Sequence, residues 1–416
     1  MKLQSSPFAP DHFPDLPAVK GVRAATTSRG FYAGSGQKRD DVFLFAFDLG
    51  TVCAGVFTRS TTASADVSWC REALASSGGK ARALIANSGN SNAFTGPQGV
   101  LKNEATLSAL MAVLDAPKDQ CFLAATGVIG EPLPDPNYIG SAVPEMAARL
   151  GPPDWQACAR AFMTTDTYAK AAGVTCDIDG QTVSLAGIAK GSGMIAPNMA
   201  TMLAYVFTDM AIAPDLLDQL LREATAQSFN AITVDGDTST SDTLMVFATG
   251  ASGAPMLSQR DDPRLVPFTD ALKQVCLDLA IQIVKDGEGA SKFISITVDG
   301  ARDNQSARII ANDIANSPLV KTALAAGDAN WGRVVMAAGK SGEPIDLEML
   351  AIRFDDVQVA QAGARAPDYD EAAASAVCAE PEIAIHVTVG SGPGHAKVYT
   401  CDLTHAYIDI NGAYRT

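Results

Sequence analysis

The segment Lys190-Gly-Ser-Gly-Met-Ile-Ala-Pro-Asn-Met-Ala-Thr-Met-Leu203 sets glycines, hydroxyls and one lysine inside an otherwise apolar stretch. Two β-rich runs, 174–178 and 182–185, precede it, and the Asp179-Gly180 pair between them has the turn chemistry of a tight hairpin. An apolar run, 202–207, follows and is typical of a strand. These patterns predict a sheet around the segment that is antiparallel at least in part.

Outward from this segment, strand and helix signals alternate along the whole chain, which favours a layered α/β or α+β architecture. Prolines predict helices that begin at Pro214 and Pro267, and the Ser317-Pro318 pair predicts a third that ends at Gly327. The Asp299-Gly300 pair after the run 293–298 predicts a second tight hairpin. The stretch 250–264, rich in Gly, Ser, Pro and Asp, is predicted to be a surface loop.

Length, composition and net charge limit the class of protein and the partners that we expect. A chain of 416 residues is expected to form two or three packed units, and 47% hydrophobic with 19% charged residues is typical of a soluble globular protein. The net charge of −15 argues against partners with phosphate backbones and against anionic membranes. We therefore expect neither a nucleic-acid partner nor a membrane partner.

The same sequence carries no sign of export. Met1–Gly21 lacks the hydrophobic region of a secretory signal, and no stretch supplies the roughly 20 apolar residues of a membrane span. The eight cysteines include no CxxC pair, which predicts reduced and mostly buried thiols. These features lead us to expect a cytoplasmic protein.

The sequence does not contain the familiar catalytic and metal-binding motifs in full. Gly339-Lys340-Ser341 lacks the first glycine of a phosphate loop and is predicted to end a helix. The run Asp235, Asp237, Asp242 lacks the glycine and glutamate of a calcium loop and is predicted to be a polar turn after a strand. The histidines show no HExxH spacing. No metal is expected.

What remains unusual is a set of polar islands, many of them rich in glycine. Each alone is typical of a turn. Together they supply hydroxyls, backbone N–H groups, one lysine and one glutamate, an inventory that suits acyl transfer by a hydroxyl nucleophile whose base is not histidine. The islands are 87–96, 125–130, 164–167, 190–203, 235–243, 286–290 and 411–416.

The run 190–203, the order of the other islands and the segment Asp328-Ala-Asn-Trp-Gly-Arg333 together resemble the ornithine acetyltransferase family, also called glutamate N-acetyltransferase, over essentially the whole chain. The resemblance implies an αββα-type sandwich of the N-terminal-nucleophile-like kind with a smaller C-terminal α/β domain. The domains expected are 1–285 and 286–416, the latter with a tail that returns to the active site. The mature family state is a heterotetramer of two copies of each of two chains.

The two chains arise, by this resemblance, from self-cleavage between Ala200 and Thr201 into 1–200 and 201–416. Thr201 then becomes the nucleophile, and its new α-amino group, with an ordinary pKa of about 7.7 to 8.0, can act as the base. From pattern alone Thr201 is equally a further residue of the apolar strand that follows.

The resemblance also assigns the other site residues. Thr126 and Gly127 form the oxyanion hole, and substrate-binding positions fall on Thr164, Lys190, Thr201, Glu288, Asn411 and Thr416. Lys190 is suited to a substrate α-carboxylate and Glu288 to an ammonium group. The chain departs from the family pattern at Ala413, where an acidic residue is usual, and at Ser91 and Phe94, where alanine and cysteine are common.

The predicted reaction transfers the acetyl group of N2-acetylornithine to glutamate through an acetyl-threonine intermediate, with no metal or organic cofactor. Whether acetyl-CoA is also a donor stays open. Two alternatives remain: a self-processing aminopeptidase or amidase with the same nucleophile, and a non-catalytic binding protein that retains the fold.

Overall fold

The computed structural model describes residues 4–33, 39–196 and 202–413. A four-stranded sheet has the order β1 (Val22–Thr27), β2 (Val42–Phe47), β4 (Ala83–Asn87), β5 (Cys121–Ala125). A five-stranded sheet has the order β3 (Val52–Phe57), β9 (Thr243–Ala248), β8 (Leu203–Thr208), β7 (Gln181–Lys190), β6 (Lys170–Ile178). Only the pairs β4–β5 and β8–β9 are parallel within these sheets, as far as the described residues extend.

The two sheets pack face to face through aromatic rings. Ring centroids lie 4.4 Å apart for Phe45 and Phe207 and 4.5 Å apart for Phe47 and Phe247, and all four side chains are buried. Because side chains alternate along β2, Val42 and Leu44 face the opposite way, into a core shared with α2 (Gly96–Leu114). The strand is thus buried on both faces.

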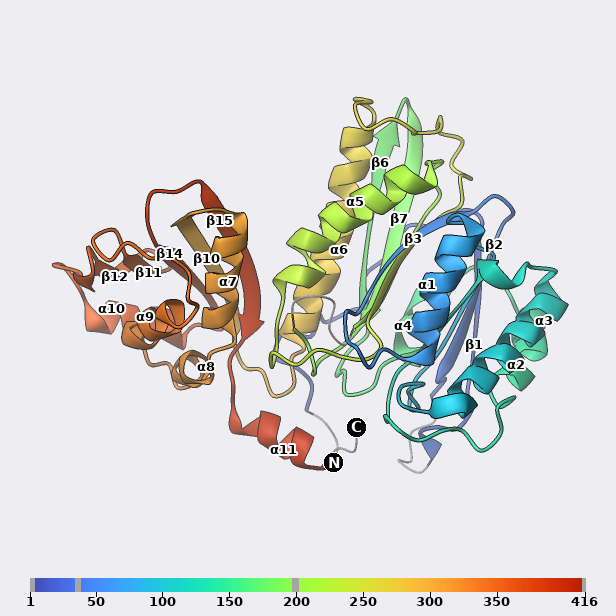
Figure 1. Cartoon of the computed structure of the whole chain (residues 1–416), viewed down its shortest axis with the longest axis horizontal. Coiled ribbons are helices and arrows are strands. Elements are labelled where there is room, and N and C mark those ends of the chain that lie inside the picture. Colours follow the sequence, from blue (N-terminus) through green and yellow to red (C-terminus); the bar gives the residue numbers. More distant parts are fainter. Residues whose placement is uncertain (1–3, 34–38, 197–201, 414–416) are drawn as a thin grey trace.

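Helices cover the outer faces of both sheets (Figure 1). The helices α5 (Pro214–Gln227) and α6 (Leu265–Lys285) pack on the five-stranded sheet, and α2 with α3 (Val143–Ala148) packs on the four-stranded one. The helices α1 (Ala65–Ser77) and α4 (Trp155–Ala161) add residues to the core between the sheets. This αββα layering confirms the predicted fold class. Short 3₁₀ turns are η2 (Lys118–Gln120), η3 (Gly140–Ala142) and η4 (Phe229–Ala231).

The last part of the chain forms a separate α/β unit around a six-stranded sheet (Figure 1). The strand order is β13 (Ala364–Arg365), β12 (Val357–Gln361), β11 (Ala351–Phe354), β14 (Glu382–Thr388), β10 (Phe293–Ala301), β15 (Gly394–Cys401). Its helices are α7 (Asn304–Ala315), α8 (Pro318–Ala325), α9 (Trp331–Gly339) and α10 (Glu371–Ala379). After β15 the chain leaves this sheet and forms α11 (His405–Ala413). The exact boundary at 285/286 stays a prediction.

Local signals predicted several elements correctly. The β6–β7 hairpin turns at Asp179 and Gly180, whose φ angles of 52° and 75° are those of a tight turn with two left-handed residues. The helix α5 begins at Pro214, and α8 begins at Pro318 after the Ser317 cap. The helix α9 ends at Gly339, and most of the stretch 250–264 is an exposed loop. All eight cysteines are free and seven are buried, as predicted.

Three local predictions were wrong. Asp299-Gly300 makes no hairpin but continues β10 through a bulge, where Gly300 has a φ of 78° and a Cβ would lie 2.0 Å from the Gly390 carbonyl oxygen. The helix α6 begins at Leu265, so Pro267 lies in its first turn but does not open it. The segment 235–242 follows η4 and precedes β9, so it is no turn after a strand.

The described residues include no helix long and apolar enough to cross a membrane.

Candidate active site

The predicted site residues lie where strands of both sheets begin or end. Because β4 and β5 are parallel, the loops that follow Asn87 and Ala125 leave the same edge of their sheet. In the other sheet, Lys190 at the end of β7 pairs with Leu203 at the start of β8, and Leu203 pairs with Thr243 at the start of β9. Two polar islands, 190–203 and 235–243, therefore meet at one edge of this sheet.

A cavity of about 250 Å³ opens at this edge. Six residues predicted from the sequence line it together, from elements far apart in the chain: Thr126, Gly127, Thr164, Lys190, Glu288 and Asn411. The remaining predicted residues, Ala200, Thr201 and Thr416, lie outside the described residues.

The loop after β5 carries the predicted oxyanion hole. The Thr126 N–H donates to the Asn87 carbonyl at 3.0 Å, which leaves the Thr126 hydroxyl and the Gly127 N–H as the donors near the cavity. Gly127 has a φ of 130°, and a Cβ there would lie 2.4 Å from the carbonyl carbon of Gly89. Only glycine fits this position.

Lys190 supplies a buried positive charge. Its side chain is 3% exposed, and Nζ donates to Thr126 Oγ1 at 3.4 Å. Burial lowers the pKa of the Lys190 ammonium, and the negative charge of Asp166 opposes this shift. A substrate carboxylate would favour the charged form further and would gain a strong charge-assisted hydrogen bond.

Glu288 is no solvated surface residue, since it is only 9% exposed. Its Oε2 accepts a hydrogen bond from Asn411 Nδ2 of α11 at 2.6 Å, and its backbone N–H donates to Ser192 O at 2.8 Å. Burial raises the pKa of Glu288, while hydrogen bonds from Thr165 and Asn411 lower it. The site thus holds a carboxylate within the same cavity as a lysine.

Sequence reasoning missed Asp235. Its carboxylate accepts the backbone N–H groups of Met194 at 2.6 Å and Ile195 at 3.0 Å, and the Tyr407 hydroxyl of α11 lies 3.3 Å from it. Burial raises the pKa of Asp235. This residue therefore anchors the end of the described loop before position 197 and ties it to α11.

Asp242 was also missed. Its side chain is fully buried, Oδ1 accepts the Met202 N–H at 2.8 Å, and Oδ2 accepts no hydrogen bond from the described part of the chain. Burial raises the pKa of Asp242 well above its ordinary value. The carboxyl group fixes the residue that directly follows Thr201.

Asp242→Asn should change how stability depends on pH. The pKa of an aspartate in an unfolded chain is about 3.9, whereas the folded protein holds this proton to a higher pH. Rising pH therefore lowers the free energy of unfolding of the wild type. In Asp242→Asn this loss is absent, because the asparagine side chain does not titrate. Thermal melts from about pH 4 to pH 7 should show the Tm of the variant rising relative to wild type, and parallel curves would contradict a raised pKa.

Among the described residues, no group of three His, Cys, Asp or Glu side chains is placed to hold a metal ion.

Comparison with known proteins identifies the family. A family model described as the ArgJ family matches residues 25–416. The chain is 52% identical to the arginine biosynthesis bifunctional protein ArgJ of Bradyrhizobium diazoefficiens, with 100% of both chains covered. The chain belongs to the ArgJ family. The ArgJ protein of Zymomonas mobilis is 50% identical, with 99% of each chain covered. Among solved structures, ArgJ of Bacillus halodurans is 38% identical, with 50% of this chain and 98% of that chain covered and a TM-score of 0.49.

ArgJ membership confirms the family predicted from the run 190–203. It also confirms the predicted class of activity, an acyltransferase of arginine biosynthesis. The roles of individual residues in the cavity do not follow from membership and are argued below from their geometry.

Proposed function

We propose that this protein transfers the acetyl group of N2-acetylornithine to glutamate through an acetyl ester on Thr201. The observation that carries this proposal is the meeting of six predicted residues in one cavity, with hydroxyl and N–H donors on one loop and a buried lysine and glutamate beside them. Family membership supports the same reaction class.

The reaction runs in two halves. In the first, Thr201 Oγ attacks the acetyl carbonyl carbon and its proton passes to the α-amino group of Thr201, while the Thr126 hydroxyl and the Gly127 N–H stabilise the oxyanion. The C–N bond then breaks, and ornithine leaves with that proton. In the second, the neutral amine of glutamate attacks the ester carbon, and its proton passes through the α-amino group to Thr201 Oγ as the C–Oγ bond breaks. N-acetylglutamate leaves and the Thr201 hydroxyl is restored.

The charges of the cavity suit amino-acid substrates. Acetylornithine and glutamate both carry an α-carboxylate, for which the buried ammonium of Lys190 is a complement. Glu288, held by Asn411, can accept hydrogen bonds from a substrate ammonium. A net acidic protein can thereby bind small zwitterionic molecules in one enclosed site.

The same proposal extends to the assembly. We expect cleavage between Ala200 and Thr201, a heterotetramer of two copies of each chain, a cytoplasmic location and no cofactor, because the acetyl donor is itself an amide. Acetyl-CoA is a second donor to be tested.

An assay with each acetyl donor in turn and glutamate held constant tests the function. We expect acetylornithine to yield N-acetylglutamate and ornithine in equal amounts, because the acyl-enzyme is intercepted by glutamate. Release of free acetate with glutamate present would favour the amidase or aminopeptidase alternative. Absence of any product from a correctly folded protein would favour the binding protein.

A further inference from the structure

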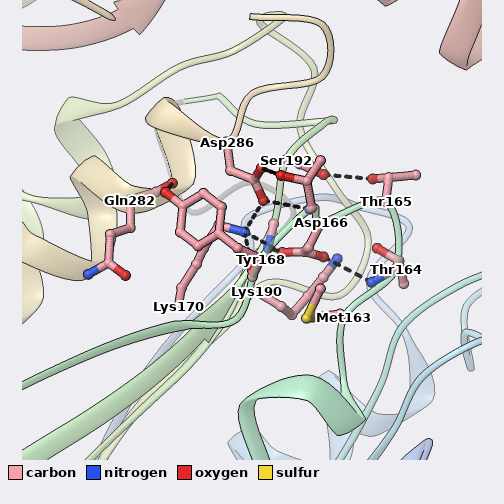
Figure 2. Close-up of polar contacts among 12 residues, drawn as sticks. Met163, Thr164, Thr165, Asp166, Tyr168, Lys170, Lys190, Ser192, Gln282 and Asp286 are labelled. Atoms are coloured by element: carbon pink, nitrogen blue, oxygen red, sulfur yellow. Dashed lines mark hydrogen bonds and ion pairs between the residues drawn. The ribbon is translucent and has the colours of Figure 1, made fainter. Parts of the chain in front are cut away.

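Outside the cavity, a lysine lies fully buried between two carboxylates (Figure 2). Lys170 Nζ is 2.7 Å from Asp166 Oδ1 and 2.5 Å from Asp286 Oδ2, and the exposed fraction of all three side chains is 0%. We call these three residues the Lys170 cluster. None of the three is among the described residues that line the 250 Å³ cavity.

The cluster binds the backbone of loops that carry cavity residues. Asp166 Oδ1 accepts the Gly191 N–H at 2.6 Å, next to Lys190, and Asp166 Oδ2 accepts the Thr164 N–H at 2.9 Å. The side chains lie as Figure 2 shows, with Asp166 between Lys170 and the Thr164 backbone.

The third segment of the cavity reaches the cluster through Asp286. Its carboxylate accepts the N–H of Thr167 at 2.9 Å and the hydroxyl of Thr167 at 2.5 Å. Glu288 lies two residues further along the chain, and its N–H is bound by Ser192 O. Three cavity segments, 164–167, 190–193 and 286–288, are therefore joined by one group of charges.

Stability alone is a weak reason for this arrangement. Removing three charged groups from water costs several kcal/mol for each ion, and well-packed apolar residues often replace such groups without loss. Although burial opposes its ionisation, the charges of Lys170 and Lys190 lower the pKa of Asp166, so its carboxylate stays charged. The directed hydrogen bonds to backbone atoms are what apolar residues could not supply.

We propose that the Lys170 cluster is a positioning device that sets the spacing of Thr164, Lys190 and Glu288, and so governs substrate binding and not self-cleavage. This rests on the proposed function, in which those three residues hold the substrate. Other contacts hold the oxyanion loop and the residue after the cleavage position, namely Asn87 O to Thr126 N and Asp242 to Met202 N.

Asp166→Asn is the sharpest test. Asparagine has one acceptor oxygen where aspartate has two, so it cannot serve both the Gly191 and Thr164 N–H groups at their present positions. We expect the KM for acetylornithine to rise about 10- to 100-fold, the cost of misplacing positioning groups. We expect kcat to stay within about threefold, because other contacts hold the Thr126 backbone and Met202, the residue after the nucleophile. The fraction of chains cut at 200/201 should equal that of wild type.

Lys170→Met removes the cation, and Lys292→Met is its matched control. Lys292 is also buried, and its Nζ donates to the carbonyls of Cys378 at 2.8 Å and Glu380 at 3.0 Å, in the C-terminal unit. Both variants lose a buried cation, but only Lys170→Met should raise KM. If Lys170→Met does not fold, Asp166→Asn and the control decide the question.

The proposal is overturned if Asp166→Asn lowers the cut fraction or kcat while KM stays at the wild-type value, or if Lys292→Met raises KM equally. Calorimetric titration of the processed protein with ornithine separates this proposal from the proposed function. A wild type that binds ornithine but makes no N-acetylglutamate refutes the function, whereas equal ornithine affinity in wild type and Asp166→Asn refutes the cluster's role.

Discussion

Thr201→Ala should give a single uncut chain without acetyl transfer. The substitution removes the hydroxyl that attacks the preceding peptide bond and, later, the acetyl carbonyl, so both reactions lose their nucleophile together. Loss of the nucleophile of a covalent catalyst lowers kcat by about 10⁴-fold or more. Denaturing mass spectrometry reports the cleavage, and an assay for N-acetylglutamate reports the transfer.

Two matched variants make this result specific. Thr201→Ser keeps a hydroxyl and a future α-amino group, so it should be cut and active. Thr208→Ala makes the same change at a buried threonine at the end of β8, whose Oγ1 accepts the Met210 N–H at 3.2 Å, and should be cut and active as well. Cleavage at 200/201 in Thr201→Ala, or wild-type transfer by the uncut chain, would refute the proposed nucleophile.

Elements with strictly local signals were predictable from sequence. Pro214 and the Ser317-Pro318 pair begin helices because the missing N–H of proline and the serine cap act within one turn. The Asp-Gly pair predicted a hairpin turn correctly at Asp179-Gly180 and wrongly at Asp299-Gly300. The glycine of the second pair serves the close approach of the Gly390 carbonyl, a contact between distant segments that no local pattern records.

The residues of the site also differ in how far the sequence could predict them. The residues that bear chemistry, such as Lys190 and Glu288, lay in islands whose order resembles a family, so they were predicted. Asp235, Asp242 and Asp166 lie in the islands 235–243 and 164–167 as well, but they act by accepting backbone N–H groups from other loops, a role that no motif marks. One signal was present, because Asp242 lies two residues before the apolar run 244–248 and Lys170 lies between alanines. Charges in such surroundings are costly to bury without partners.

Gly127→Ala should give a protein that, once cut at 200/201, binds substrate but turns over slowly. A Cβ at this position would lie 2.4 Å from the Gly89 carbonyl carbon and 2.6 Å from the Asn90 nitrogen, and both atoms belong to the backbone. The φ of 130° is also strained for any residue with a Cβ. The loop must therefore shift and turn the Gly127 N–H away from the oxyanion. Loss of one such donor lowers kcat by about 10²- to 10³-fold.

Gly130→Ala is the matched control in the same loop. Its φ of 82° is also left-handed, but the nearest atom to a new Cβ is Phe94 Cδ1 at 3.9 Å. Both variants therefore place an alanine at a positive φ angle, which costs about 1 kcal/mol of stability. Only Gly127→Ala adds a backbone clash beside the cavity. Steady-state kinetics should show a large fall of kcat at Gly127 with KM little changed, and kcat within about threefold of wild type at Gly130. Equal losses in the two variants would mean that loop strain, and not an oxyanion donor, explains the effect, and the Gly127 assignment would fall.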